Sequence, residues 1–182
     1  MDNITETELY AALPLFLDAP KDNAPILDLC LRPDYGQRDF VERITLTRKN
    51  GIPGERWNRA PWIKLPDGSP DPRIQVSILG KRVMDAVWRD RANTPHPGDT
   101  MIADMDFSHE NMPVGQLLQA GSALIRVSDV FNDACVKWKT RYGTPAKDFI
   151  TVPAHVTYRL RGILCEVVED GIVTLGDRLT KI

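Results

Sequence analysis

The sequence predicts a mainly β protein with a few short helices, an α+β fold whose sheet forms a β-barrel-like core. Short stretches of β-branched, aromatic and alternating apolar residues are separated by turns, and 12 glycines and 14 prolines are available to build those turns. Helical spacing of apolar residues occurs in only a few short segments. Many short strands between Gly- and Pro-containing turns are typical of barrels and related β cores.

The length and composition indicate one compact globular domain. A chain of 182 residues supports one sizeable core but is short for two ordinary domains. Hydrophobic residues make up 42% and charged residues 26%, as in soluble globular proteins. The net charge of −2 provides no broad basic surface, so we expect neither nucleic acid nor an anionic membrane as a partner.

The sequence also favours a cytoplasmic location without a membrane segment. No stretch approaches the roughly 18 consecutive apolar residues of a membrane span, and the first residues lack the pattern of a signal peptide. The cysteines Cys30, Cys135 and Cys165 are widely spaced and form no Cys-x-x-Cys pair, so we expect reduced thiols. Cys30 and Cys165 lie within apolar runs and are expected in the core.

Residues 1–22 are predicted to form a helical segment, and residues 23–182 a single barrel domain. The stretch Thr5–Leu17 has apolar residues on one side, and Thr5 with Glu8 fits a capping box. Pro14 predicts a break or a kink, because proline inside a helix removes a hydrogen bond. We expect this segment to pack against the domain or against a second copy.

The strands of the barrel domain are expected where apolar residues alternate or cluster between turn residues. They are Ile26–Leu31, Phe40–Thr47, Ile74–Ile78, Thr100–Phe107, Ala123–Ser128, Val156–Leu160, Ile163–Val168 and Ile172–Leu175. Glu169–Gly171 predicts a hairpin turn between the last two.

Short helices are expected at Lys81–Trp88 and from Thr144-Pro145 to Ile150, where threonine and proline suit a helix start. The segment Asn58–Arg73 contains four prolines and one glycine and predicts a long irregular loop. Such a loop often flanks a functional site, but the sequence favours a variable surface insertion as its explanation.

The most informative stretch is Asp129–Gly143, which follows a predicted strand. Asn132 or Asp133 is expected to cap a helix that ends at Gly143. Cys135 then lies in the first helical turn, where free N–H groups and nearby lysines favour a thiolate. Such a thiol suits a nucleophile or a soft-metal ligand. The alternative is a small packed apolar residue beside a solvated basic helix face.

The spacing Cys135-x-Lys137-Trp138-x-x-Arg141-Tyr142-Gly143 resembles a segment of small bacterial MOSC-domain proteins, a family named after the C-terminal domain of molybdenum-cofactor sulfurases. Two segments depart from the common pattern. Glu55 replaces an aspartate, and Asn132-Asp133-Ala134 replaces a His-Thr-Gly that often precedes the cysteine. Further landmarks occur in the same order: Gly51-Ile-Pro-Gly-Glu-Arg-Trp57, Gln75-Val-Ser-Ile-Leu79, Glu110-Asn-Met-Pro-Val-Gly115, Arg159-Leu-Arg-Gly-Ile163 and Gly176-Asp177.

The resemblance implies a fold similar to the small β-barrel of pyruvate kinase, and molybdenum cofactor (Mo-molybdopterin) as ligand. Cys135 matches the position of the molybdenum-ligating and catalytic thiolate. The implied activity is the reduction of N-hydroxylated or N-oxygenated small molecules. The chain contains no flavin or iron–sulfur motif, so a separate electron-donor protein is expected.

A pterin cofactor carries a phosphate and polar ring edges, which arginine and amide groups recognise. We expect Arg159 and Arg161 to alternate on one strand and therefore to face the same side. For each residue an ordinary solvated or turn-holding role is the alternative. The candidate cofactor-binding residues are Arg56, Asn111, Lys137, Arg159 and Arg161.

Other functions compete with this one. The domain could be a non-enzymatic carrier of cofactor or sulfur, or a structural domain without cofactor. A pair of Cys135 with His155 matches no known catalytic spacing. The three histidines lie on separate segments, which argues against a zinc site made only of protein ligands.

Overall fold

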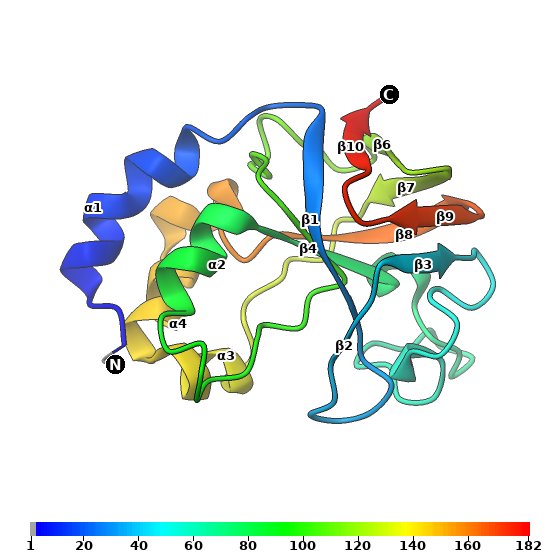
Figure 1. Cartoon of the computed structure of the whole chain (residues 1–182), viewed down its shortest axis with the longest axis horizontal. Coiled ribbons are helices and arrows are strands. Elements are labelled where there is room, and N and C mark those ends of the chain that lie inside the picture. Colours follow the sequence, from blue (N-terminus) through cyan, green and yellow to red (C-terminus); the bar gives the residue numbers. More distant parts are fainter. Residues whose placement is uncertain (1–2) are drawn as a thin grey trace.

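The structure, a computed structural model, describes residues 3–182 and contains a closed barrel with short helices packed outside it (Figure 1). In the described chain seven strands close the barrel in the order β1-β10-β6-β7-β8-β4-β5, and β5 pairs again with β1. Adjacent strands are antiparallel except β4 and β5, which are parallel. The predicted α+β, barrel-like fold class is confirmed. The barrel strands are β1 (Ala24–Leu31), β4 (Val76–Gly80), β5 (Met101–Ala103), β6 (Leu117–Ala120), β7 (Ala123–Val127), β8 (Ile163–Glu169) and β10 (Arg178–Lys181).

Three short strands lie beside the barrel. β2 (Asp39–Phe40) extends the sheet from β1, whereas β3 (Arg43–Leu46) and β9 (Gly171–Thr174) form a separate antiparallel ribbon. The expected strand Phe40–Thr47 is therefore split between β2 and β3. The predicted hairpin at Glu169–Gly171 is wrong, because β9 pairs with β3 and not with β8. Gly171 packs so closely on the Ala123 backbone that a side chain would overlap it.

Two other predicted strands differ from the structure. Only Met101–Ala103 of Thr100–Phe107 is a strand. The strand Val156–Leu160 is wrong: Pro153–Tyr158 forms the 3-10 helix η3, and Arg159 follows in the left-handed region with φ 47°. Pro153 at the start of η3 has the fixed φ of a first helical turn, and this outweighs the β-type pattern of the residues after it.

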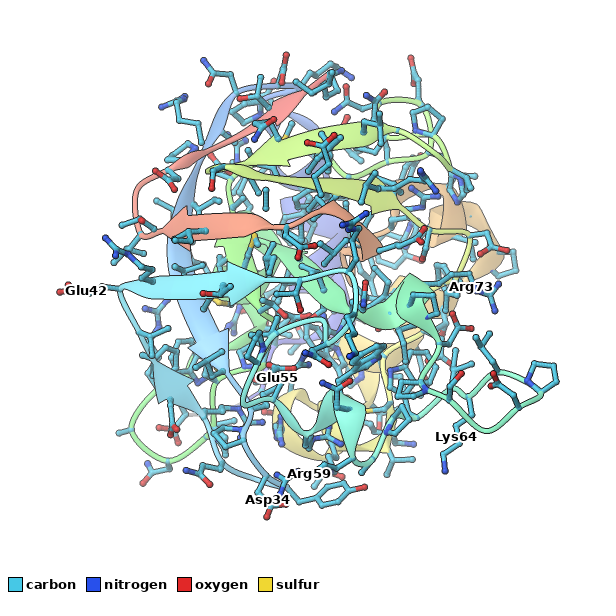
Figure 2. The ribbon with its side chains drawn as sticks, turned by 90° about the vertical axis from the view of Figure 1, so that its right-hand side faces the viewer. Asp34, Glu42, Glu55, Arg59, Lys64 and Arg73 are labelled. Atoms are coloured by element: carbon cyan, nitrogen blue, oxygen red, sulfur yellow. The ribbon has the colours of Figure 1, made fainter. Side chains whose placement is uncertain are left out.

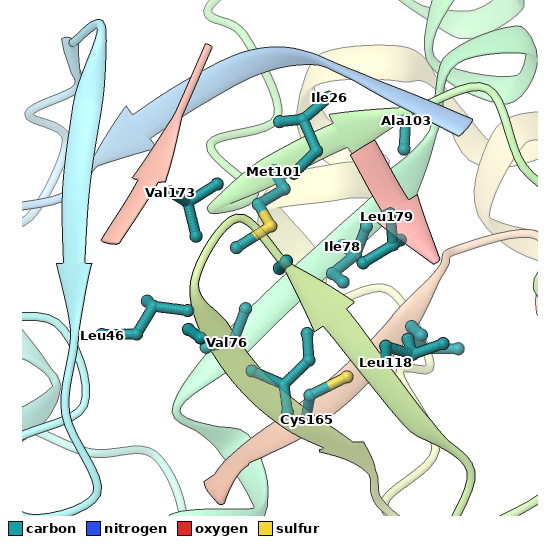
Figure 3. Packing of buried hydrophobic residues seen from close by; sticks show 14 of the residues in the cluster. Ile26, Leu46, Val76, Ile78, Met101, Ala103, Leu118, Cys165, Val173 and Leu179 are labelled. Atoms are coloured by element: carbon teal, nitrogen blue, oxygen red, sulfur yellow. The ribbon is translucent and has the colours of Figure 1, made fainter. Parts of the chain in front are cut away.

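Apolar side chains fill the barrel and form a second core beneath the helices. Figure 3 shows the barrel interior, where Ile26, Val76 and Met101 are fully buried. Because β4 has buried residues on both faces, Ile78 points into the barrel core and Leu79 belongs to the outer one. The helices that cover this outer core are α1 (Glu6–Leu17), α2 (Lys81–Val87), α3 (Val136–Tyr142) and α4 (Thr144–Thr151).

The N-terminal helix forms as its capping residues predict. Thr5 and Glu8 make the capping box, and Leu9 and Phe16 are buried in the outer core. The predicted break at Pro14 is wrong, because the helix continues to Leu17 and the Asp18 N–H donates to the Pro14 carbonyl at 3.0 Å. None of the helices in residues 3–182 is both long and apolar enough to cross a membrane.

The segment Asn58–Arg73 is irregular, as predicted. It contains the end of η1 (Arg56–Asn58), an isolated bridge between Lys64 and Pro70, and the start of η2 (Pro72–Ile74). Figure 2 shows the part around Lys64 extending away from the barrel.

Candidate functional site beside Cys135

The Cys135 thiol is exposed at the start of α3. Cys135 is the N-cap residue, one position before the first helical turn in which it was expected. Its carbonyl accepts the Trp138 N–H at 2.9 Å, while no side chain caps the helix. The predicted cap by Asn132 or Asp133 is wrong, because the Asn132 amide donates to the Arg161 carbonyl at 3.4 Å. The sulfur is therefore accessible to a ligand.

The helix that carries Cys135 is held firmly by its buried face. The Trp138 indole donates to the Ala146 carbonyl at 3.2 Å, and the Tyr142 hydroxyl donates to the Pro95 carbonyl at 2.8 Å. Gly143 ends α3 as predicted, with φ 93°. Ala134, just before the cysteine, is buried and has a left-handed backbone with φ 58°. Fixed contacts on both sides thus determine where the thiol lies.

The two other cysteines belong to the core, as predicted. Cys30 and Cys165 are fully buried. Burial raises the pKa of Cys30 to about 11 and also raises the pKa of Cys165. Both thiols therefore stay protonated near pH 7.

Two predicted cofactor-binding residues meet at one aromatic ring. Arg56 and Lys137 both lie over Tyr35, with the guanidinium carbon 4.6 Å and the lysine nitrogen 5.1 Å from the ring centroid. Tyr35 lies on the turn Pro33–Gly36 and is 65% exposed. Lys137 belongs to α3, the helix that starts at Cys135, so this ring brings Arg56 to the same helix.

Arg161 also lies against α3. Its guanidinium carbon is 4.5 Å from the centre of the Trp138 ring, and its Nη1 donates to Asp99 Oδ1 at 2.8 Å. Thus Arg56, Lys137 and Arg161 come from three distant segments and all reach the end of the barrel that holds α3.

Arg159 does not join them, so the expectation that it faces the same side as Arg161 is wrong. Its Nη1 donates to the Met112 carbonyl at 2.6 Å, and its Nη2 is 3.1 Å from His109 Nδ1. The left-handed turn at Arg159 after η3 sends the two side chains in different directions. Arg159 also lines a small cavity of about 20 Å³ near α1 and α2, which has room for about one water.

Asn111 is committed to a different network. Its amide nitrogen donates to the carbonyls of Lys21 and Asp106, both at 2.8 Å, and its oxygen accepts from Lys181 at 2.8 Å. Lys181 lies in β10, which Figure 1 shows well away from α3. His155 is buried against Tyr10 and Phe149, and its Nδ1 is 2.7 Å from the Phe149 carbonyl oxygen.

Several charged residues near α3 were not among the predicted site residues. Glu55 is buried and accepts hydrogen bonds from Arg32 Nε and Nη2, both at 3.0 Å. Figure 2 shows Glu55, Arg59 and Asp34 in the same lower part of the molecule. The Arg141 guanidinium donates to the Pro97 carbonyl at 3.4 Å. Arg38 lies against Gly98, where an added Cβ would be 2.9 Å from its Nε.

Four side chains around Gly98 form what we call the Gly98 cluster, namely Arg38, His96, Asp99 and Arg161. Each has a buried polar atom without a hydrogen-bond partner: Arg38 Nε, His96 Nε2, Asp99 Oδ2 and Arg161 Nε. Burial lowers the pKa of His96 to about 4, so the ring is neutral near pH 7. Arg38 and His96 lie in loops without any motif.

The end of the barrel around α3 is electropositive. Within residues 3–182, Arg38, Arg56, Lys137 and Arg141 form no ion pair with a carboxylate, whereas Arg32 and Arg161 are each paired once. Burial and the charge of Arg141 lower the pKa of Arg38, which shows that positive charges crowd together here. The arrangement can attract and hold an anionic ligand beside an accessible thiol.

Comparisons with known proteins agree on the fold. No protein-family model matches the sequence, and no curated protein matches it. The structure is similar to YiiM from Escherichia coli, with a TM-score of 0.58, 16% identity, and coverage of 88% of this chain and 69% of that one. It is also similar to YuaD from Bacillus subtilis, with a TM-score of 0.56, 16% identity, and coverage of 86% and 94%.

YiiM from Geobacillus stearothermophilus gives a TM-score of 0.52 at 14% identity, over 90% of this chain and 74% of that one. YiiM and YuaD are MOSC-domain proteins. At these low identities the likeness establishes the fold alone, and this fold agrees with the family that the sequence resembles.

Proposed function

We propose that this chain is a MOSC-type protein that binds molybdenum cofactor through Cys135. We further propose that it reduces N-hydroxylated or N-oxygenated small molecules with electrons from a separate donor protein. The observation that supports this most directly is an exposed thiol at an electropositive end of the barrel, where three of the five predicted cofactor-binding residues lie. The fold likeness and the sequence landmarks support it independently.

The residues present fit such a cofactor. A thiolate is a soft ligand that suits molybdenum already held by the two sulfurs of a pterin. Arg56, Lys137 and Arg161 can hold the anionic and polar parts of the pterin, and the Arg161 Nε–H is buried without a partner. Asn111 and Arg159 stay predictions, and their present hydrogen bonds go mainly to backbone carbonyls.

The roles of the chain's own groups follow from these positions. When bound, the cofactor would supply the two-electron redox chemistry. Cys135 would anchor it, and the rigid contacts of Trp138 and Tyr142 would keep the sulfur in place. Val136, the residue after Cys135, and Tyr35, which Lys137 covers, are exposed and would provide an apolar rim for a small organic substrate.

Metal and pterin analysis tests the ligand assignment. The protein expressed in a molybdenum-replete host should contain close to one molybdenum per chain. Cys135→Ser should lose most of it, because an alcohol is a much poorer ligand for a soft metal centre. Val136→Ser, which changes the exposed neighbour and keeps the thiol, should retain it. A Cys135→Ser protein with full molybdenum content would contradict the assignment.

Turnover separates an enzyme from a carrier. With cofactor bound and a chemical reductant supplied, the protein should convert a hydroxylamine substrate to the amine, and Cys135→Ser should not. Bound cofactor without turnover would favour a carrier of cofactor or sulfur. Absence of cofactor in the wild-type protein would favour a domain that works without one.

A further inference from the structure

The Gly98 cluster concentrates unsatisfied polar atoms in one place. Of the five such buried atoms in the described chain, four belong to this cluster. His96 is 4% exposed and Asp99 1% exposed, so water at the surface does not reach these groups. Buried polar groups in proteins nearly always have partners, and leaving several unpaired at one position costs stability. Such a group of atoms indicates a place for a ligand.

The hydrogen-bonding role of each atom can be assigned. His96 Nδ1 accepts the Gly98 N–H at 3.0 Å, so the proton of the neutral ring lies on Nε2. Arg38 Nε and Arg161 Nε carry protons at all accessible pH values. Asp99 uses Oδ1 for Arg161 and keeps Oδ2 as an acceptor. The cluster therefore offers three N–H donors and one carboxylate acceptor.

This set matches a tetrahedral oxyanion that still carries a proton. Three of its oxygens can accept from the N–H donors, and its O–H can donate to Asp99 Oδ2. Inorganic phosphate keeps at least one proton at neutral pH, whereas sulfate keeps none. The guanidinium groups of Arg38 and Arg161 together carry more charge than the Asp99 carboxylate. Arg141, which donates to the nearby Pro97 carbonyl, adds a further positive charge. We propose that the Gly98 cluster binds a protonated phosphate group.

Arg38 lies where a ligand would enter the Gly98 cluster. It lies between the turn Pro33–Gly36 and β2, is only partly buried, and is tethered by one hydrogen bond from Nη1 to the Gly36 carbonyl at 3.0 Å. For a ligand to enter, this side chain would have to move off Gly98. Gly98 is required for this contact, because a Cβ there would meet the guanidinium.

The inference shares Arg161 with the proposed function but goes beyond it, because the cluster does not include Cys135 and needs no metal. Two sources can supply a protonated phosphate group: free inorganic phosphate, and the singly charged form of a phosphate monoester on a larger ligand such as a pterin cofactor, whose last proton is lost near pH 6. Loaded and unloaded protein distinguish them. If the monoester is the natural ligand, cofactor-loaded protein should no longer bind phosphate; if free phosphate is, both forms should bind it.

Titration calorimetry on the unloaded full chain tests the site, with inorganic phosphate, methyl phosphate and sulfate at constant ionic strength. Phosphate should bind once per chain and at least tenfold more tightly than sulfate. Asp99→Asn should weaken phosphate at least tenfold and abolish the preference over sulfate, because its amide can donate to an unprotonated oxygen. Equal binding of the two anions to the wild-type chain would overturn the proposal, as would an unchanged preference in Asp99→Asn.

Three further variants keep this test independent of folding and of the cofactor. Arg38 is only partly buried, so Arg38→Gln should weaken phosphate binding without changing the thermal midpoint much, whereas Arg126→Gln, on β7 and paired with Glu166, should change neither. Cys135→Ser should bind phosphate like the wild-type chain. A chain that lacks molybdenum but binds phosphate would contradict the proposed function alone.

Discussion

Glu55 shows how a single side chain can stabilise the segment that presents a site residue. Its carboxylate accepts three hydrogen bonds from Arg32, one from the backbone N–H at 3.1 Å and two from the guanidinium at 3.0 Å. The pair connects the end of β1 to the start of η1, and the next residue is Arg56. The residue that departs from the family pattern therefore holds a loop in place.

Removing this carboxylate should destabilise the fold measurably. We expect Glu55→Ala to lower the free energy of unfolding by about 2–3 kcal/mol, because it leaves a partly buried guanidinium without its partner. Urea unfolding followed by circular dichroism measures the change. Glu166→Ala removes the surface pair with Arg126 and should cost less than about 1 kcal/mol. Equal costs for the two variants would show that burial of Glu55 contributes little.

His96 makes the stability depend on pH in a defined direction. Burial lowers its pKa to about 4 in the folded chain, from 6.5 for an exposed histidine. The unfolded chain therefore binds more protons between these pH values, and stability should fall as the pH drops from about 6.5 to about 4. In His96→Gln, the fall in the free energy of unfolding between these two pH values should be smaller by up to about 3 kcal/mol. Parallel pH profiles for both proteins, measured by urea unfolding, would contradict this explanation.

At the scale of elements, Gly162 positions Arg161 where η3 gives way to β8. It has φ 82°, and a Cβ would overlap the Ile78 carbonyl oxygen of the neighbouring strand β4. This close approach of two backbones fixes how the Arg159–Gly162 turn enters the barrel. The direction of the Arg161 side chain depends on it.

Two glycine variants separate this close approach from backbone strain. Gly162→Ala should destabilise the chain by at least about 2 kcal/mol more than Gly54→Ala. Gly54 also has a positive φ, 92°, but nothing lies within 4 Å of an added Cβ, so only the strain of the left-handed backbone remains. Thermal and urea unfolding of both proteins provide the comparison, and similar losses would mean that β4 can shift to make room.

For the whole molecule, the sequence predicts the fold class well and the site in part. The barrel strands around Ile26, Val76 and Ile163 follow from local apolar patterns, and the cysteine at a helix start follows from its motif. The pairing of β3 with β9 depends on contacts between distant segments, which no local pattern reports. The turn at Arg159 was missed because Val156, Thr157 and Tyr158 have strand-type side chains within a 3-10 helix.

The Gly98 cluster could not be found from the sequence for a related reason. Arg38, His96 and Arg161 are far apart in the chain, and of the three only Arg161 lies in a motif. Only closure of the barrel brings their loops together at the end that holds α3. The chemistry of that end is therefore a property of the tertiary fold.

The pairing of β1 with both β5 and β10 has a consequence for synthesis on the ribosome. β10 fills the position between β1 and β6, so the sheet has two open edges until residues 178–181 have emerged. Nascent chains that stop earlier should therefore be vulnerable to proteases and to strand exchange with one another.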